Sequence, residues 1–191
     1  MLTINESIIL QYIKKATDNS RVNKRGVLGK KALQKCMYFF NLNENYFYFK
    51  WADYGPFSKE LQNIAGFLID SEKINVEKEK TGKKNAITQI LTFKDETKIY
   101  DKLPENVNAK IDEIIKFSSG LNPRELELLA SVHFWAEREQ GYLEKYTSEY
   151  ILEKLTDLKP DAGFKKDDVE WAIEKLEDNG FLAKNDDNSQ N

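Results

Sequence analysis

The spacing of apolar residues predicts two helices near the start of the chain. The first begins with Thr3 and Glu6, which have the spacing of a capping box. Its buried stripe follows at helical spacing: Ile9, Tyr12, Ile13 and Ala16. The second helix covers about residues 29–41, with an inner face of Leu33, Cys36, Met37 and Phe40. Its other face is expected to be polar and exposed: Lys31, Gln34, Lys35 and Tyr38.

Residues 46–51, YFYFKW, form the most strand-prone run in the chain, and a rigid turn follows them. Gly55 can adopt backbone angles that other residues avoid, and Pro56 fixes φ for the turn. Ser58 is a candidate N-cap of the next helix, with Glu60 near its positive end. We expect Phe57 to anchor this strand-to-helix corner by burying its ring. The helix itself has a clear apolar stripe: Leu61, Ile64, Ala65, Leu68 and Ile69.

A hairpin is predicted after that helix, with strands at 74–76 and 86–93 and a turn at Gly82. The resulting order is helix, helix, strand, helix, strand, loop, strand, which is typical of a winged-helix domain. Residues 77–85 would form the wing, with three lysines near its tip: Lys80, Lys83 and Lys84.

The second half of the chain is predicted to be almost entirely helical. A linker covers residues 96–106, and Asn122-Pro123 gives a cap followed by proline at the first helical position. The last helix ends at Asn179-Gly180, and Phe181-Leu182 is expected to pack back as a short strand. The predicted fold is therefore α+β and mostly helical, with a winged-helix-like domain at 1–95. A helical, winged-helix-like half follows at 107–183, and a polar tail at 184–191.

Composition narrows the class of protein. No apolar run reaches the roughly 20 residues that cross a bilayer, so no membrane partner is expected. The single cysteine, Cys36, excludes an intramolecular disulfide and fits a reducing cytoplasm. The net charge of -3 conceals an asymmetry, because residues 1–100 carry 17 Lys/Arg and 11 Asp/Glu while the remainder is acidic. Two surfaces with different partners are the expectation.

Residues 33–61 resemble a known family. LQKCMYFF, followed by FKWADYGPFSKEL, is similar to the YwgA-like family of prokaryotic proteins, and more distantly to the Panacea domain of SocA-like antitoxins. The matching positions are Leu33, Gln34, Lys35, Tyr38, Tyr54, Gly55, Pro56, Phe57, Ser58, Glu60 and Leu61. Cys36 stands where a leucine is common. The resemblance implies a helical domain, a prokaryotic or viral source and an antitoxin-like or regulatory role, and it implies no catalytic residue.

The residue types needed for catalysis are scarce. One cysteine and one histidine cannot supply an ordinary zinc site, and no Walker A, GxGxxG, HExxH or CxxC pattern occurs. His133 lies on the apolar stripe of its helix, which favours a core histidine over a catalytic base. Cys36 likewise favours a buried structural thiol over a nucleophile. We therefore expect a protein that is not an enzyme and that uses no metal or cofactor.

Two functions remain open. The first is binding of double-stranded DNA by a winged-helix regulator, through basic residues of the first helices and the wing: Arg21, Lys24, Arg25, Lys30, Lys31, Lys35, Lys83 and Lys84. The second is a protein-interaction adaptor whose acidic second half holds a basic protein, such as a toxin or a regulator. A homodimer is compatible with both functions. The low pI of about 5.4 counts against DNA binding, and an ordinary solvated surface also explains the lysines.

Overall fold

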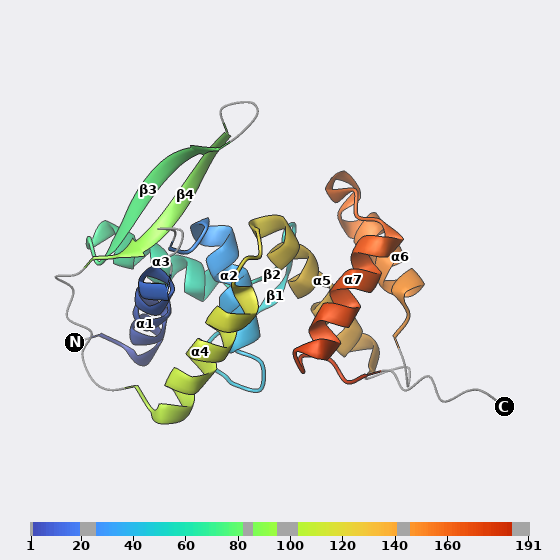
Figure 1. Ribbon diagram of the computed structural model, residues 1–191, viewed down its shortest axis with the longest axis horizontal. Helices are drawn as coiled ribbons and strands as arrows, with labels where there is room; N and C mark the ends of the chain where they lie inside the picture. Colours follow the sequence, from blue (N-terminus) through green and yellow to red (C-terminus); the bar gives the residue numbers. More distant parts are fainter. Residues whose placement is uncertain (1, 20–25, 82–85, 95–102, 141–145, 185–191) are drawn as a thin grey trace. The chain divides into compact units, whose positions relative to one another are not determined.

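The computed structural model describes residues 2–19, 26–81, 86–94, 103–140 and 146–184. The protein is α+β and mostly helical, as the sequence predicts (Figure 1). The chain divides into two compact units, Met1–Lys50 with Phe57–Leu126, and Trp51–Pro56 with Glu127–Asn191. The elements of the described residues are α1 (Ile4–Asn19), α2 (Gly29–Phe40), β1 (Lys50–Ala52), β2 (Gly55–Phe57), α3 (Lys59–Asp70), β3 (Ile74–Thr81), β4 (Ala86–Phe93), α4 (Glu105–Ser118), α5 (Pro123–Gln140), α6 (Ser148–Leu158), η2 (Pro160–Ala162) and α7 (Lys166–Asp178).

The capping box predicted for α1 is present. The backbone N–H of Glu6 donates to Oγ1 of Thr3 over 3.2 Å, and the Thr3 N–H donates to Oε2 of Glu6 over 2.6 Å. Two otherwise unpaired backbone donors are thereby satisfied at the helix start. One face of α1 then packs against α3, α4 and β4, and its middle residues are fully buried: Ile8, Ile9, Leu10 and Ile13.

Helix α2 is the central helix of the first unit, and this corrects the prediction of a polar outer face. It packs against α3, α4 and β4, so that no open side remains after its first turn. Gln34, Lys35 and Tyr38 are buried with exposed fractions of 6%, 3% and 7%, whereas Lys30 and Lys31 are exposed. The predicted polar face is therefore part of the interior, and only the N-terminal turn of α2 is accessible to a partner.

The predicted strand at Tyr46–Trp51 is wrong for most of its length, since β1 begins only at Lys50. Side-chain amides replace the partner strand that residues 46–49 would need. The Asn41 side chain accepts from the Phe47 N–H and donates to the Phe47 carbonyl, both over 2.8 Å. The Asn5 amide donates to the carbonyl of Tyr46, also over 2.8 Å. This aromatic run is thus an irregular segment tied to α1 and to the end of α2.

The corner before α3 is built around Ser58. Gly55 has a φ of 85°, which explains why glycine occupies this position. Ser58 is fully buried and caps α3 by accepting from the Leu61 N–H over 3.2 Å, as predicted. The buried Gln34 amide accepts from the Ser58 N–H over 3.0 Å and donates to the Ser58 carbonyl over 2.9 Å. Phe57 is half-buried, and Ser58 makes the hydrogen bonds that hold this corner.

The predicted hairpin is confirmed, and its first strand is longer than the sequence indicates. β3 and β4 pair antiparallel from Ile74↔Phe93 to Thr81↔Ala86, and they project from the helices of the first unit (Figure 1). Val27 supplies a third strand position, exchanging two backbone hydrogen bonds of 2.9 and 2.8 Å with Leu91 of β4. The strand position that pairs with the β3–β4 sheet therefore lies between α1 and α2, whereas the strands between α2 and α3, β1 and β2, pair with each other.

Gly26 permits this pairing. A Cβ atom added at Gly26 would lie 2.1 Å from the carbonyl oxygen of Leu91, a distance that no side chain can adopt. Because the neighbouring atom is backbone, a larger residue could be accommodated only by moving the chain away from β4. The glycine thus fixes where residues 26–28 meet the sheet, and with them the start of α2.

The second unit contains most of α5 together with α6, η2 and α7. The cap predicted at Asn122, before α5, is present, because Asn122 accepts from the N–H groups of Arg124 and Glu125. Thr147 caps α6 by accepting from the Tyr150 N–H. α6 packs against α7 and η2. Phe181 and Leu182 are buried as expected, but they form a bend and not the predicted strand.

The division into units also differs from the predicted boundary at residues 96–106. Helix α4, which the sequence analysis placed in the C-terminal half, packs against α1 and α2 within the first unit. Residues 95–102 of the predicted linker, and residues 185–191 of the predicted tail, lie outside the described residues.

The core of the second unit contains a buried lysine. The Nζ atom of Lys159 lies 2.6 Å from Oε1 of Glu127 and 5.5 Å from the ring centroid of Trp51. Its side chain is only 2% exposed, so the carboxylate and the aromatic face together replace the water that the ammonium loses. Trp51 in turn contacts the rings of Phe134 and Trp135. The opening residues of the WADYGPFSKEL stretch are thus part of this core.

Replacement of Gln34 by alanine tests the central buried contact. Gln34→Ala leaves the buried N–H of Ser58 without a partner, at a cost of about 1–3 kcal/mol. It also removes one of the two hydrogen bonds that the Ser58 carbonyl accepts, worth about 1 kcal/mol, while the bond from the Gln62 N–H remains. We expect the free energy of unfolding to fall by about 2–4 kcal/mol in urea titrations. Gln62→Ala, which truncates an exposed glutamine of α3, is the matched control and should stay within about 0.5 kcal/mol of wild type. Equal stabilities of the two variants would contradict the assignment.

Candidate nucleic-acid interface

The exposed start of α2 carries the first part of the candidate interface. Lys30 and Lys31 are both exposed there, and the N-cap residue Leu28 makes no side-chain capping hydrogen bond. The partial positive charge of a helix N-terminus adds to the two ammonium groups. Backbone N–H groups at such an end are suitable donors to a phosphate. This turn is therefore a local concentration of positive potential.

The β3–β4 hairpin adjoins this turn. A Cβ atom added at Gly29 would lie 3.3 Å from the carbonyl oxygen of Gln89, so the first residue of α2 is close to the backbone of β4. Gln89 pairs with Lys78 of β3, and Lys80 pairs with Ile87. Lys78 and Lys80 are exposed. We call Lys30, Lys31, Lys78 and Lys80 the basic surface; the register of the sheet places these residues on adjoining segments of one unit.

Helix α3 precedes the β3–β4 hairpin, and its exposed side is not basic. Gln62 and Asn63 are exposed, and Lys59 donates to Oε1 of Gln62 over 2.8 Å. Phe67 is 53% exposed, and the Nζ atom of Lys73 lies 5.7 Å from its ring centroid. The carboxylates of Glu60 and Asp70, both exposed, offset the charge of Lys59. This helix can offer amides and an aromatic ring, but little attraction for phosphate.

The structure keeps two of the predicted DNA-binding residues at the surface and removes a third. Lys30 and Lys31 are exposed as expected, whereas Lys35 is buried in the interior of the first unit. Lys35 is therefore withdrawn from the candidate interface, because α3, α4 and β4 cover the later turns of α2. The other predicted members lie outside the described residues: Arg21, Lys24, Arg25, Lys83 and Lys84.

The sequence analysis named Lys80 among the lysines near the wing tip but did not identify Lys78 of β3. The predicted first strand ended at residue 76, so Lys78 was assigned to the wing loop. The signal for the longer strand was weak, because the apolar positions Ile74 and Val76 are followed by four charged residues at 77–80. The proximity of Gly29 to Gln89 had no such signal, since it depends on the pairing of Val27 with Leu91.

Most of the residues that carry the family resemblance are buried in this fold. Gln34 and Ser58 bond to each other in the interior, and Gly55 and Pro56 are buried. Leu33, Tyr38 and Leu61 are buried core residues, and Tyr38 packs edge-on against Phe49. Glu60 is exposed and accepts from the Asn5 amide over 2.9 Å. Tyr54 remains 55% exposed, which leaves this ring accessible at the tip of the β1–β2 hairpin.

His133 has the surroundings of a core residue. It is 2% exposed, and Nε2 lies 3.1 Å from the carbonyl oxygen of Phe181. Burial lowers the pKa of His133 to about 4, while the hydrogen bond to Phe181 opposes that shift. The imidazole is therefore neutral at physiological pH and is fixed in the packing between α5 and the segment after α7.

Cys36 is equally unsuited to nucleophilic chemistry. The thiol is buried, and burial raises its pKa to about 11. Among the described residues, no group of three or more His, Cys, Asp and Glu side chains could hold a metal ion. Within the same ranges, no helix has both the length and the apolar character needed to cross a membrane.

The comparisons with known proteins do not add a family to this geometry. No family model matches the chain, and a search of the curated proteins finds no match. What bears on function is therefore the arrangement of helices and hairpin in the first unit and the lysines at its surface.

The pKa of His133 predicts a specific loss of stability in mild acid. The unfolded state, with an ordinary histidine pKa near 6.5, binds more protons than the folded state between pH 6.5 and pH 4. The contribution of the neutral imidazole is complete above the unfolded pKa and is lost as the pH falls. From about pH 7 to about pH 5, the free energy of unfolding should decrease by about 2 kcal/mol on this account.

His133→Gln isolates this effect, because His133 is the only histidine of the chain. The variant is expected to be less stable at neutral pH and to have a smaller dependence on pH between those two values. Urea titrations of both proteins at each pH provide the measurement. An unchanged pH dependence in the variant would show that another group is responsible.

Proposed function

We propose that this protein is a non-catalytic regulator of the winged-helix type that binds double-stranded DNA through the basic surface. The observation that carries the proposal is the placement of the exposed first turn of α2, with Lys30 and Lys31, beside a hairpin that carries Lys78 and Lys80. The resemblance of residues 33–61 to the SocA-like antitoxin module supports a regulatory role in the cytoplasm of a prokaryote.

The basic surface supports binding of the DNA backbone more than reading of its sequence. Lysines that neutralise phosphates release condensed counterions, which gives affinity that falls steeply with salt. The α2 N-terminus can add backbone N–H donors to a phosphate oxygen. Gln62 and Asn63 of α3 are suitable for adenine edges, but Glu60 and Asp70 repel phosphates on the same helix. We therefore expect modest affinity and weak dependence on base sequence from the first unit alone.

A double substitution tests the basic surface. Lys30→Ala/Lys31→Ala removes two exposed charges from the first turn of α2 without disturbing its buried side. Each lost phosphate contact should reduce the slope of log affinity against log salt by about one, so the variant should lose about two. The measurement is a fluorescence-anisotropy titration of a labelled duplex at about 50 mM and about 200 mM salt.

Lys165→Ala/Lys166→Ala is the matched control, because it removes two adjacent lysines from the start of α7 in the second unit. This control should bind DNA with the wild-type salt dependence. Equal effects of the two double substitutions would mean that only the net charge matters. Wild-type protein without salt-sensitive DNA binding would refute the proposal.

The second candidate function, an adaptor for a basic protein, is favoured by the exposed face of α7. Trp171 is 37% exposed on this helix, and the acidic residues around it recur at helical spacing: Asp167, Glu170, Glu174 and Asp178. Tryptophan is enriched in the hot spots of protein–protein interfaces, and here it is surrounded by charged residues. Of these carboxylates, Glu170 lies 3.5 Å from Lys166, so part of the charge is already compensated. A refuted DNA proposal would leave this face as the leading candidate site.

A further inference from the structure

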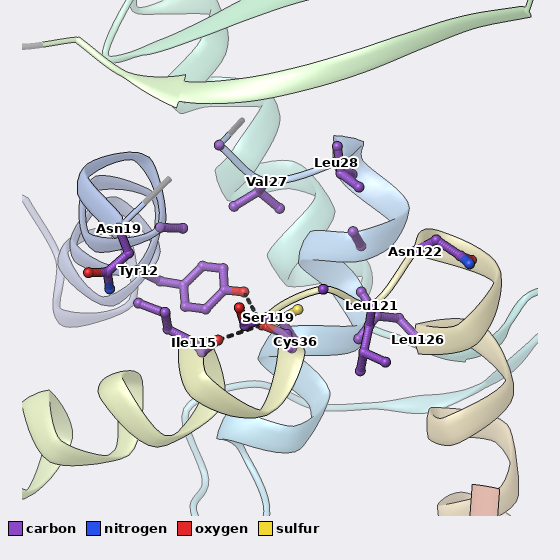
Figure 2. Close-up of a pocket in the computed structure, with 15 residues that line it drawn as sticks. Tyr12, Asn19, Val27, Leu28, Cys36, Ile115, Ser119, Leu121, Asn122 and Leu126 are labelled. Carbon is purple, nitrogen blue, oxygen red and sulfur yellow. Dashed lines mark hydrogen bonds between the residues drawn. The ribbon is translucent and has the colours of Figure 1, made fainter. Parts of the chain in front are cut away.

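The first unit contains a cavity of about 600 Å³ that the basic surface does not use. Its walls come from α1, the first half of α2, the end of α4, the turn from α4 to α5, and residues 26–28. Figure 2 shows the Tyr12 ring reaching from α1 toward α2 and this turn. The volume lies in the range of about 300–1,000 Å³ that small-molecule sites occupy.

The polar groups of the cavity are concentrated around one side chain. The Tyr12 hydroxyl lies 3.4 Å from Oγ of Ser118, which in turn donates to the carbonyl of Ile115 over 3.4 Å. Cys36 lies at the same place, with its sulfur atom close to this pair (Figure 2). Tyr12 is only 2% exposed and Ser118 is partly exposed, so a ligand would contact this pair from the side of Ser118.

The remaining lining consists of apolar and uncharged polar residues. Aliphatic side chains form much of the wall: Ala16, Val27, Leu28, Ala32, Ile115, Leu121 and Leu126. Among the described residues that line the cavity, no Asp, Glu, Lys, Arg or His occurs. Burial raises the pKa of Tyr12 and brings that of Cys36 to about 11, so both groups are neutral at physiological pH. The described lining residues therefore offer a charged ligand no counter-charge to offset the hydration that it loses.

We propose that this cavity is a binding site for a small, uncharged ring compound that carries one hydrogen-bonding group. The ring would contact the aliphatic wall, and its polar group would bond to the Tyr12–Ser118 pair. Burial of the ring supplies the affinity, while the hydroxyls fix its orientation.

The cavity is connected to the sheet through Val27. This residue lines the cavity and also exchanges two backbone hydrogen bonds with Leu91 of β4. A ligand that packs against Val27 should restrain this pairing and slow the hydrogen exchange of the Val27 and Leu91 amides. That signature would place a bound compound at the cavity and not on the exposed face of the unit.

The experiment uses 2-naphthamide as the probe and 2-naphthoate as its anionic counterpart of the same size. Ligand-detected NMR titration of the full chain should show saturable binding of the amide, and binding of the carboxylate weaker by about tenfold or more. Leu121→Trp, which adds volume from the α4–α5 turn, should weaken binding of the amide by about tenfold or more. Leu158→Trp, at an exposed leucine of α6, is the matched control and should bind like wild type.

Thermal melting first establishes that both tryptophan variants are folded. Should Leu121→Trp fail to fold, Ala16→Leu at the α1 wall gives the same test. Absence of saturable binding of 2-naphthamide would overturn the proposal and indicate a water-filled cavity. Equal binding of the amide and the carboxylate, unchanged binding in the cavity variant, or unchanged exchange of the Val27 and Leu91 amides would also overturn it.

Discussion

The pair of hydrogen bonds between the Gln34 amide and the backbone of Ser58 is the contact on which the first unit depends. It joins the middle of the central helix α2 to the first turn of α3, and both partners are buried. A side-chain amide presents a donor and an acceptor side by side, as a peptide group does, so it pairs with both the N–H and the carbonyl of Ser58. The position of α3, and with it the direction of the chain into β3, follows from this match.

The same contact decides what the unit can present to a partner. Because Gln34 faces inward, the turn of α2 that carries Lys35 and Tyr38 is also enclosed. Within α2, the accessible charge is then restricted to Lys30 and Lys31, at the end of the helix that Gly26 and Val27 hold against β4. The lysines of the proposed DNA surface are therefore brought together by the backbone contact between residues 26–29 and β4, and they do not lie along one face of a basic helix.

Local signals in the sequence were sufficient for most of the helices and for the hairpin. Capping residues such as Thr3, Ser58 and Asn122 act within three residues of their own position, so their effect is visible in a short window. The strand predicted at Tyr46–Trp51 failed for the opposite reason. Its backbone groups form hydrogen bonds with the side chains of Asn41 and Asn5. Whether a backbone group pairs with a side-chain amide or with a neighbouring strand depends on tertiary structure, which a short sequence window does not show.

The candidate sites also differ in whether local sequence or tertiary contacts determine them. Lys30 and Lys31 could be predicted from their place at a helix start, whereas the burial of Lys35 depends on three neighbouring elements. The cavity had no sequence signal, because its walls come from residues as far apart as Tyr12 and Leu126. An apolar residue that lines a cavity has the same sequence pattern as one that fills a core.

The central claim is that the first turn of α2 and the β3–β4 hairpin form one surface for DNA. Backbone chemical-shift mapping during titration with a short duplex at low salt tests this most directly. The account predicts that the perturbed amides cluster at Lys30, Lys31, Lys78 and Lys80, and that they return to their free positions as salt is added. Perturbations centred on α7 around Trp171, or none at all, would contradict it.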